Sequence, residues 1–226
     1  MANKYVLKFS KDGYAKYTSH LDLLRFFKRA FRKSGIALSY SQGFNPHPKL
    51  GFAQPLSLGY GSSCELLEFA TDVPYDTTVI YDMLKDMMPD GLTILWCKEL
   101  DDSIKSLAAI ADFAQYEVTI PYAVSGEQLQ ELAKGYLAQE EILAMKKQKK
   151  DKKLVSVNIK HMIRSFEAMA NDDEIVLKLL LDCGSISNCS PELVIASFCE
   201  YAKIDIPRYA MEVERQILGF NGNLVF

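Results

Sequence analysis

The stretch SHLDLLRFFKRAFRKSG, residues 19–35, predicts an amphipathic helix, and the elements around it decide the fold. Ser19, followed three residues later by Asp22, fits a capping box in which a hydroxyl and a carboxylate satisfy free backbone amides. Gly35 is a natural stop, because glycine readily adopts the left-handed conformation that ends many helices. Apolar side chains fill one side of this helix, and the other side carries five basic residues, namely Arg25, Lys28, Arg29, Arg32 and Lys33.

Strands and a second helix are expected around this helix in the order strand, helix, strand, strand, helix, strand. Apolar alternation and turn residues place strands at residues 5–9, 36–40, 66–71 and 92–98, with extended structure resuming at 50–58 and a helix at 77–88. This order within about 100 residues is typical of the ferredoxin-like, or split βαβ, fold.

The second half of the chain is expected to repeat that order. Strands are predicted at 116–121, 142–147, within 154–169, and at 174–182 and 209–220, with helices at 126–138, capped by Ser125, and from Ser190-Pro191. We therefore predict an α+β protein of two tandem ferredoxin-like modules with antiparallel sheets. The N-terminal module covers residues 1–100, a linker covers 101–114, and the C-terminal module covers 115–226.

The composition is that of a globular protein, with 226 residues, 49% hydrophobic and 24% charged. No apolar run reaches the roughly 20 residues that a membrane span needs, and the start of the chain lacks a secretory apolar region. The sequence thus predicts a soluble, cytoplasmic protein. The five cysteines are scattered along the chain, at Cys64, Cys97, Cys183, Cys189 and Cys199. This spacing predicts buried thiols in a reducing compartment, and not a disulfide framework, a zinc site or an iron–sulfur cluster.

Charge is distributed unevenly along the chain. Residues 1–60 hold ten Lys and Arg against two Asp and Glu, which gives this segment a net charge of +8. Since the whole chain has a net charge of −3, the remaining residues carry −11. A basic end of this size favours an anionic partner such as nucleic acid or phosphate. The lysine-rich segment at 146–153 predicts a hairpin tip, with nonspecific attraction of phosphate as the functional alternative.

The segment SQGFNPHPK, residues 41–49, predicts a stiff loop. Asn45 and His47 each precede a proline and are biased to extended backbone, and Gly43 allows a sharp turn before them. Such a loop would display Phe44, His47 and Lys49, pre-organised to hold a ligand. The alternative is a structural crossover between strands.

His20 is the second candidate, because free amides and the positive dipole end at a helix start favour an anion. A phosphate there would meet backbone donors, His20 and Arg25, although a histidine at this position is commonly only packed or solvated. His20 and His47 together would suffice for metal-independent cleavage of RNA if the fold brought them together. A metal shared by His20, Asp22 and His47 has no spacing rule to support it.

Two motifs together carry a resemblance to a known family. SHLDL at residues 19–23, followed by YSQGFNPHP at 40–48, resembles the signature of the radical-SAM-linked protein family, and PLSLG at 55–59 and ELLE at 65–68 fit the same pattern. This bacterial group occurs beside, or fused to, a radical S-adenosylmethionine enzyme, and its members tend to be encoded near ribosomal-protein and ribonuclease genes. The resemblance implies a radical-SAM partner that holds the S-adenosylmethionine and the iron–sulfur cluster, and it makes an RNA substrate (tRNA or rRNA) plausible.

The first hypothesis is a non-catalytic accessory protein that presents RNA to a radical-SAM enzyme and binds no cofactor itself. The alternatives are a metal-independent endoribonuclease that uses His20 and His47, and a structural docking subunit without substrate contact. The tandem fold is also similar to that of CRISPR RNA-processing endonucleases, but a fold does not fix a function. In the first hypothesis cationic residues hold phosphates, Phe44 stacks a base, and the surface comprises Ser19, His20, Arg25, Arg29, Arg32, Gln42, Phe44, Asn45, His47 and Lys49.

Overall fold

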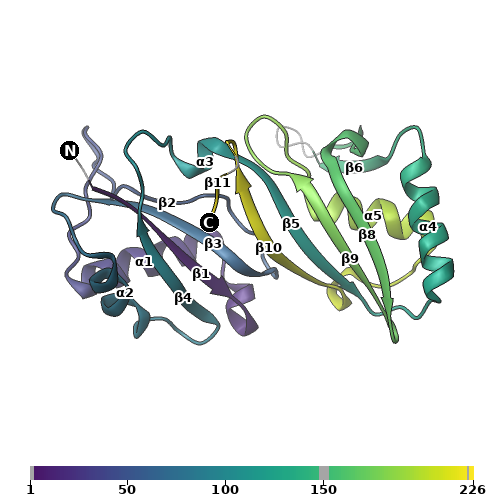
Figure 1. Cartoon of the computed structure of the whole chain (residues 1–226), viewed down its shortest axis with the longest axis horizontal. Coiled ribbons are helices and arrows are strands. Elements are labelled where there is room, and N and C mark those ends of the chain that lie inside the picture. Colours follow the sequence, from purple (N-terminus) through teal and green to yellow (C-terminus); the bar gives the residue numbers. More distant parts are fainter. Residues whose placement is uncertain (1–2, 148–152, 223) are drawn as a thin grey trace. The chain divides into compact units, whose positions relative to one another are not determined.

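The chain forms two compact units of mixed α+β structure (Figure 1). Unit 1 comprises residues Met1–Ala111 and Leu218–Phe226, and unit 2 comprises Asp112–Ile217. The computed structural model describes residues 3–147, 153–222 and 224–226. Within these residues, no helix has the length and apolar character to cross a membrane.

Unit 1 contains an antiparallel sheet in the order β4-β1-β3, with β2 paired to the other edge of β3. The expected linker 101–114 contains a short helix, α3 (Leu107–Ile110), and the beginning of the strand β5 (Ala111–Ile120). The elements of unit 1 are β1 Asn3–Lys11, the 3-10 helix η1 Gly13–Tyr17, α1 His20–Ser34, β2 Leu50–Phe52, β3 Gly61–Thr71, α2 Thr77–Lys85, β4 Leu92–Glu99, α3 Leu107–Ile110 and β11 Leu224–Val225.

Helices α1 and α2 cover one face of this sheet and enclose the core of unit 1. The buried side chains come from alternate positions of the strands and from the apolar stripe of each helix. They include Tyr5, Leu7, Phe9, Phe27, Phe31, Phe52, Leu67, Phe69, Ile80, Leu84, Leu92 and Ile94.

The helix predicted at residues 19–34 is confirmed. Ser19 is the N-cap, and its side-chain oxygen accepts a hydrogen bond from the backbone N–H of Asp22. Gly35 ends the helix in the left-handed conformation at φ +80°. Helix α2, in contrast, ends at Lys85, three residues before the predicted end. The next residues form tighter turns, in which Met87 N–H donates to Leu84 O and Met88 N–H donates to Lys85 O, each three residues back.

The strand predicted at 36–40 is wrong. This segment makes only isolated bridges, Leu38 to Thr71 and Tyr40 to Pro48, and the edge strand β2 follows later at Leu50–Phe52. The reason lies in Ala70 of β3, whose carbonyl accepts from Ser39 N–H at 2.8 Å, while its own N–H donates to Lys49 O at 3.0 Å. Two short segments thus share one edge of β3, and neither extends along it as the predicted strand 36–40 would.

The sheet strands of unit 2 lie in the order β10-β5-β9-β8, and β9 pairs antiparallel with both β5 and β8. Helices α4 and α5 pack on one face, where Tyr136 of α4, Phe166 of β8 and Phe198 of α5 form an aromatic cluster with ring centroids 5.1–5.3 Å apart. The elements are β5 Ala111–Ile120, α4 Gly126–Ala138, β6 Leu143–Lys147, β7 Leu154–Asn158, η2 Lys160–Met162, β8 Ile163–Asn171, β9 Glu174–Asp182, α5 Pro191–Ala202, η3 Arg208–Ala210 and β10 Glu212–Phe220. The first residue of β5 and the last three residues of β10 are counted with unit 1.

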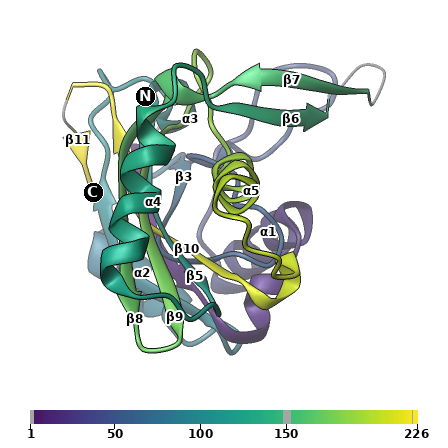
Figure 2. The ribbon, with the colours of Figure 1, turned by 90° about the vertical axis from the view of Figure 1, so that its right-hand side faces the viewer.

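The strand predicted at 142–147 exists but does not belong to this sheet. It forms β6, which pairs with β7 in a hairpin outside that sheet, shown beside α5 in Figure 2. Of the five residues of β6 only Ala144 is buried, so this strand could not fill the middle of a packed sheet. After β5, the next strand along the chain that joins this sheet is β8 instead. Most of the lysine-rich turn, residues 148–152, lies outside the described residues.

All five cysteines are buried, as predicted. Burial raises the pKa of the Cys97 thiol and of the Cys189 thiol to about 12. A thiol with so high a pKa is a poor nucleophile and a poor metal ligand at neutral pH, because both roles require the thiolate.

An ion-pair cluster makes the stability of unit 2 depend on pH. Arg164 of β8 contacts Asp112 at 2.9 Å and Asp182 at 2.6 Å. Hydrogen bonds from Arg164 hold the pKa of Asp112 below its ordinary value. The stabilisation by Asp112 is therefore present above the unfolded pKa of about 4 and is lost as the pH falls through the lowered folded pKa.

We expect Asp112→Asn to weaken this acid-dependent loss of stability. Urea unfolding followed by circular dichroism at pH about 6 and pH about 3 checks it, because the asparagine cannot take up the proton that the aspartate binds on unfolding. An equal acid-induced loss in the wild type and in Asp112→Asn would contradict the role given to this carboxyl.

Candidate anion-binding surface

At the start of α1, an internal ion pair occupies the place where an anion was expected. The Ser19 hydroxyl donates to Asp22 Oδ2 at 2.7 Å, and Arg25 Nη1 donates to Asp22 Oδ1 at 2.8 Å. These two hydrogen bonds, the first being the stronger influence, hold the pKa of Asp22 below its ordinary value. The predicted capping box thus forms only in part, since Asp22 accepts from the hydroxyl of Ser19. The carboxylate of Asp22 already provides the negative charge that a helix start favours.

Beyond this ion pair, the outer face of α1 carries cations that have no carboxylate partner among the residues that the structure describes. Arg29, Arg32 and Lys33 are exposed, and Lys28 is half-buried. Together with Arg25 they recur at intervals of three and four residues, which places them on one side of the helix. From Arg25 to Arg32 this face extends about 10 Å along the helix axis.

His20 lies at the start of α1 and is half-buried against the core. Its ring meets that of Phe52 edge to face, with centroids 5.1 Å apart, and Phe52 in turn contacts Phe27. This packing fixes the orientation of the imidazole.

The loop at residues 41–49 is closed at its base by hydrogen bonds between Ser41 and His47. Ser41 N–H donates to His47 O at 2.8 Å, and His47 N–H donates to Ser41 Oγ at 3.0 Å. Gly43 has φ +133°, a conformation that other residues rarely adopt. The bonds use only the backbone of His47, so that its imidazole is exposed, as are the side chains of Gln42, Phe44, Asn45 and Lys49.

The two histidines are held in different ways. His20 packs on Phe52 and His47 is displayed by the loop, and within the described part of the chain no hydrogen bond joins them. The same residues contain no group of three His, Cys, Asp or Glu side chains that could hold a metal ion.

Lys49 also borders a mainly apolar cavity of about 320 Å³ in unit 1. The other charged groups in its wall are engaged: Lys4 Nζ donates to the backbone oxygens of Asp102 and Ile104, and Glu68 accepts from Leu107 N–H at 2.7 Å. The remaining charged side chain in the wall of this cavity is that of Lys49, at the end of the loop.

Sequence reasoning missed two aromatic residues beside this surface. Tyr14 and Tyr17 lie in η1, immediately before α1, and their side chains are 93% and 70% exposed. In the sequence, Lys11-Asp12-Gly13 indicates only a turn after the first strand. Two tyrosines three residues apart after a glycine were the available signal, but exposure cannot be read from one short turn.

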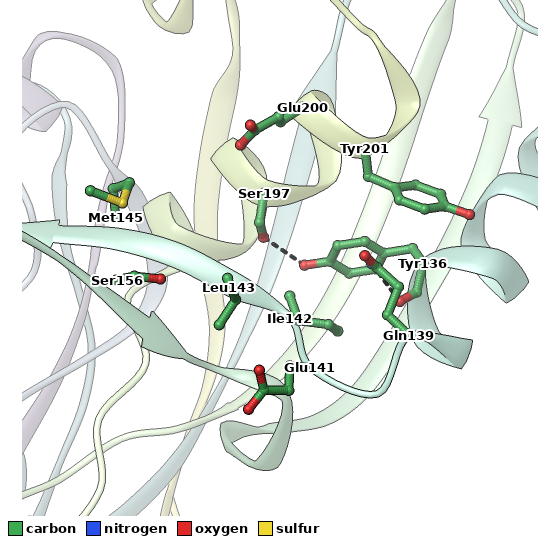
Figure 3. Close-up of a pocket in the computed structure, with 10 residues that line it drawn as sticks. All are labelled: Tyr136, Gln139, Glu141, Ile142, Leu143, Met145, Ser156, Ser197, Glu200 and Tyr201. Atoms are coloured by element: carbon green, nitrogen blue, oxygen red, sulfur yellow. Dashed lines mark hydrogen bonds between the residues drawn. The ribbon is translucent and has the colours of Figure 1, made fainter.

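A cavity of about 400 Å³ in unit 2 lies between the β6–β7 hairpin, α5 and the end of α4 (Figure 3). Its buried polar groups satisfy one another. Tyr136 donates to Ser197 Oγ at 2.7 Å, since the serine hydroxyl itself donates to Leu193 O at 2.9 Å. Burial raises the pKa of Tyr136 to about 12, so the phenol stays protonated. None of the predicted site residues lines this cavity, and its inner wall is a structural hydrogen-bonded cluster.

Two α+β units, each with helices packed on mostly antiparallel strands, define the class of protein, and an exposed basic helix defines its candidate surface. The family model described as "Uncharacterized protein conserved in bacteria (DUF2344)" matches residues 4–191, and the chain belongs to this family.

Two solved structures are similar to the chain. One is a chain of the "Crystal Structure of a Cbf5-Nop10-Gar1 Complex", at 9% identity and a TM-score of 0.50, covering 95% of this chain and 49% of the other. The chain thus spans about half the length of that relative, and the similarity shows the fold alone. The second is the "Crystal Structure of an Unknown Protein from Galdieria sulphuraria", at 9% identity, a TM-score of 0.27, and 95% and 98% coverage. No curated protein matches the sequence.

Proposed function

We propose that this chain is a non-catalytic accessory protein that binds RNA through unit 1 and presents it to a radical-SAM enzyme. The observation that carries the RNA-binding part is the outer face of α1, where Arg29, Arg32 and Lys33 are exposed without a carboxylate partner among the described residues. An array of unpaired cations on one rigid helix suits a phosphate backbone.

The loop at 41–49 favours a nucleic acid over a simple phosphate as the ligand. Its base is closed by hydrogen bonds, and it displays the exposed ring of Phe44 beside the exposed His47 and Lys49. An exposed aromatic ring on a rigid loop is the feature on which an unpaired base stacks.

The fold of both units also fits a more specific description. In each unit the strands lie in the order fourth, first, third, second, counted along the chain when the β6–β7 hairpin is set aside as an insertion. We infer that they are tandem ferredoxin-like modules, because this order with two helices on one face is the split βαβ arrangement.

The partnership with a radical-SAM enzyme rests on the resemblance of SHLDL at 19–23 and YSQGFNPHP at 40–48 to the radical-SAM-linked family. In this proposal the partner holds the S-adenosylmethionine and the iron–sulfur cluster. The buried thiols of this chain, two of them with pKa values raised to about 12, are poor cluster ligands.

The RNA-binding proposal predicts a measurable change in salt dependence. Arg29→Ala/Arg32→Ala is expected to weaken binding to all RNA sequences alike, and to reduce the slope of log K against log salt concentration by about 1.4, because each lost phosphate contact contributes about 0.7. Fluorescence anisotropy with a labelled oligouridylate at several salt concentrations measures both quantities.

The matched control is Lys105→Ala/Lys134→Ala, which removes two exposed positive charges elsewhere. It should leave affinity and slope nearly unchanged. Equal losses in both double variants would mean that only net charge matters, and the surface on α1 would be wrong.

Co-purification of the full chain from a bacterium that encodes it tests the partnership, with protein and RNA identified together. Recovery of a radical-SAM enzyme with a defined RNA supports the proposal. RNA without the enzyme would remove the partnership and favour the ribonuclease alternative. The enzyme without RNA would leave a docking subunit.

A further inference from the structure

Two tyrosine side chains project into solvent from a turn that is otherwise firmly held. Tyr14 and Tyr17 are 93% and 70% exposed, whereas tyrosine in folded proteins is usually of intermediate burial. Neither hydroxyl has a hydrogen-bond partner among the residues that the structure describes. Burial of the ring and bonding of the hydroxyl therefore do not explain why aromatic residues lie here.

The geometry of η1 puts Tyr14 and Tyr17 on the same side of the turn. In a 3-10 helix residues i and i+3 eclipse, and the rise of about 2.0 Å per residue separates them by about 6 Å along the axis. A flat ring between two others needs about 7 Å, twice the contact distance of about 3.5 Å between carbon atoms. A base would therefore enter between the rings only after the tyrosine side chains rotate to add about 1 Å.

We propose that Tyr14 and Tyr17 form a clamp that stacks one unpaired base of single-stranded RNA. This inference rests on the proposed function and specifies its substrate as a single strand. Stacking between aromatic rings tolerates any base, because every base has a flat π-face.

The backbone beneath the clamp is pre-organised. Asp12 N–H donates to Gly91 O at 2.8 Å, Gly59 N–H donates to Lys16 O at 2.8 Å, and Lys11 Nζ donates to Thr18 O at 3.0 Å. The side chain of Ala15 is buried under the turn. Little backbone entropy is lost on binding, since these contacts fix the turn before a ligand arrives.

The cations of the helix that follows the clamp favour a nucleic acid over a protein as the occupant. Leu21 and Leu58 are also exposed in unit 1, which by itself would suit an apolar protein surface. However, α1 begins three residues after Tyr17, and its unpaired cations Arg29, Arg32 and Lys33 start about 14 Å along the helix axis. A strand that leaves the clamp along this helix meets a row of positive charges.

The test compares Tyr14→Ala/Tyr17→Ala with Tyr14→Phe/Tyr17→Phe, using labelled oligouridylate as the single strand and a blunt RNA duplex. The alanine pair is expected to bind oligouridylate about ten- to a hundredfold more weakly, with an unchanged salt slope because no phosphate contact is lost. The phenylalanine pair keeps the rings and should bind within about twofold of the wild type. Duplex binding should not change in either variant. Thermal melts verify folding, and Tyr209→Ala, which removes a ring 91% exposed in unit 2, is the matched control.

Each result separates the clamp from the proposed function. Wild-type affinity in the alanine pair, together with a reduced salt slope in Arg29→Ala/Arg32→Ala, would overturn the clamp and leave RNA binding in place. No affinity of the wild type for RNA would overturn both. Unchanged RNA affinity with lost co-purification of the radical-SAM enzyme would make the tyrosine patch a protein-docking surface, which also overturns the clamp.

Discussion

Gly91→Ala is expected to destabilise unit 1 by about 3 kcal/mol and to weaken the tyrosine clamp in the molecules that stay folded. Gly91 has φ +83°, which a residue with a Cβ adopts at a cost. A Cβ built there would lie 2.5 Å from Asp12 O and 2.9 Å from Ala15 Cβ, so the turn η1 must shift. Since η1 carries Tyr14 and Tyr17, the same change disturbs the proposed base-stacking site.

Gly35→Ala is the matched control, because it imposes the same backbone cost without a clash. Gly35 has φ +80°, and no atom lies within 4 Å of the built Cβ. We expect it to cost about 1 kcal/mol and to leave the clamp intact. Urea unfolding followed by the fluorescence of Trp96, the single tryptophan, measures unit 1 directly, because this residue lies in β4. Equal losses for the two alanines would show that the close packing at Gly91 has no energetic weight.

Phe27→Ala should cost about 3–5 kcal/mol, since it removes a fully buried aromatic side chain and leaves a cavity. Phe27 is the centre of the aromatic core under α1, with ring centroids 5.1 Å from Phe9 and 6.0 Å from Phe52. Phe52 in turn holds the ring of His20, so the substitution also loosens the start of α1.

The neighbouring Phe26→Ala distinguishes core packing from the loss of any aromatic residue in this helix. Phe26 is only half-buried, and its removal should cost less than half as much. The tryptophan fluorescence transition in urea serves for both variants. A loss at Phe26 as large as that at Phe27 would contradict the description of the core.

The elements that local rules specify were predictable, and those that tertiary pairing specifies were not. Helix caps act within a single turn, and all three capped helices begin where predicted. The caps are Ser19 and Gly35 at the two ends of α1, Ser125 before α4, and Ser190-Pro191 before α5. Strand β9 follows its apolar alternation at each residue. The strand at 36–40 failed because Ala70 of β3 bonds to two different segments, which no local pattern reveals.

The same distinction applies to the candidate surface. The basic face of α1 follows from helical periodicity alone, so the sequence located Arg25, Arg29 and Arg32 on one side. It could not show that Asp22 already engages Arg25, which leaves the cations further along the helix as the available ones. Tyr14 and Tyr17 escaped notice because their exposure depends on how Gly91 and Gly59 hold the turn from distant parts of unit 1.

Photocrosslinking of the full chain to bound single-stranded RNA, with mass spectrometric identification of the crosslinked residues, tests the central claim most directly. The account predicts crosslinks in unit 1, at Tyr14, Tyr17 and Phe44 and in peptides from α1, and their loss at high salt. Crosslinks confined to residues 112–217, or none from a chain that is folded by its thermal melt, would contradict it.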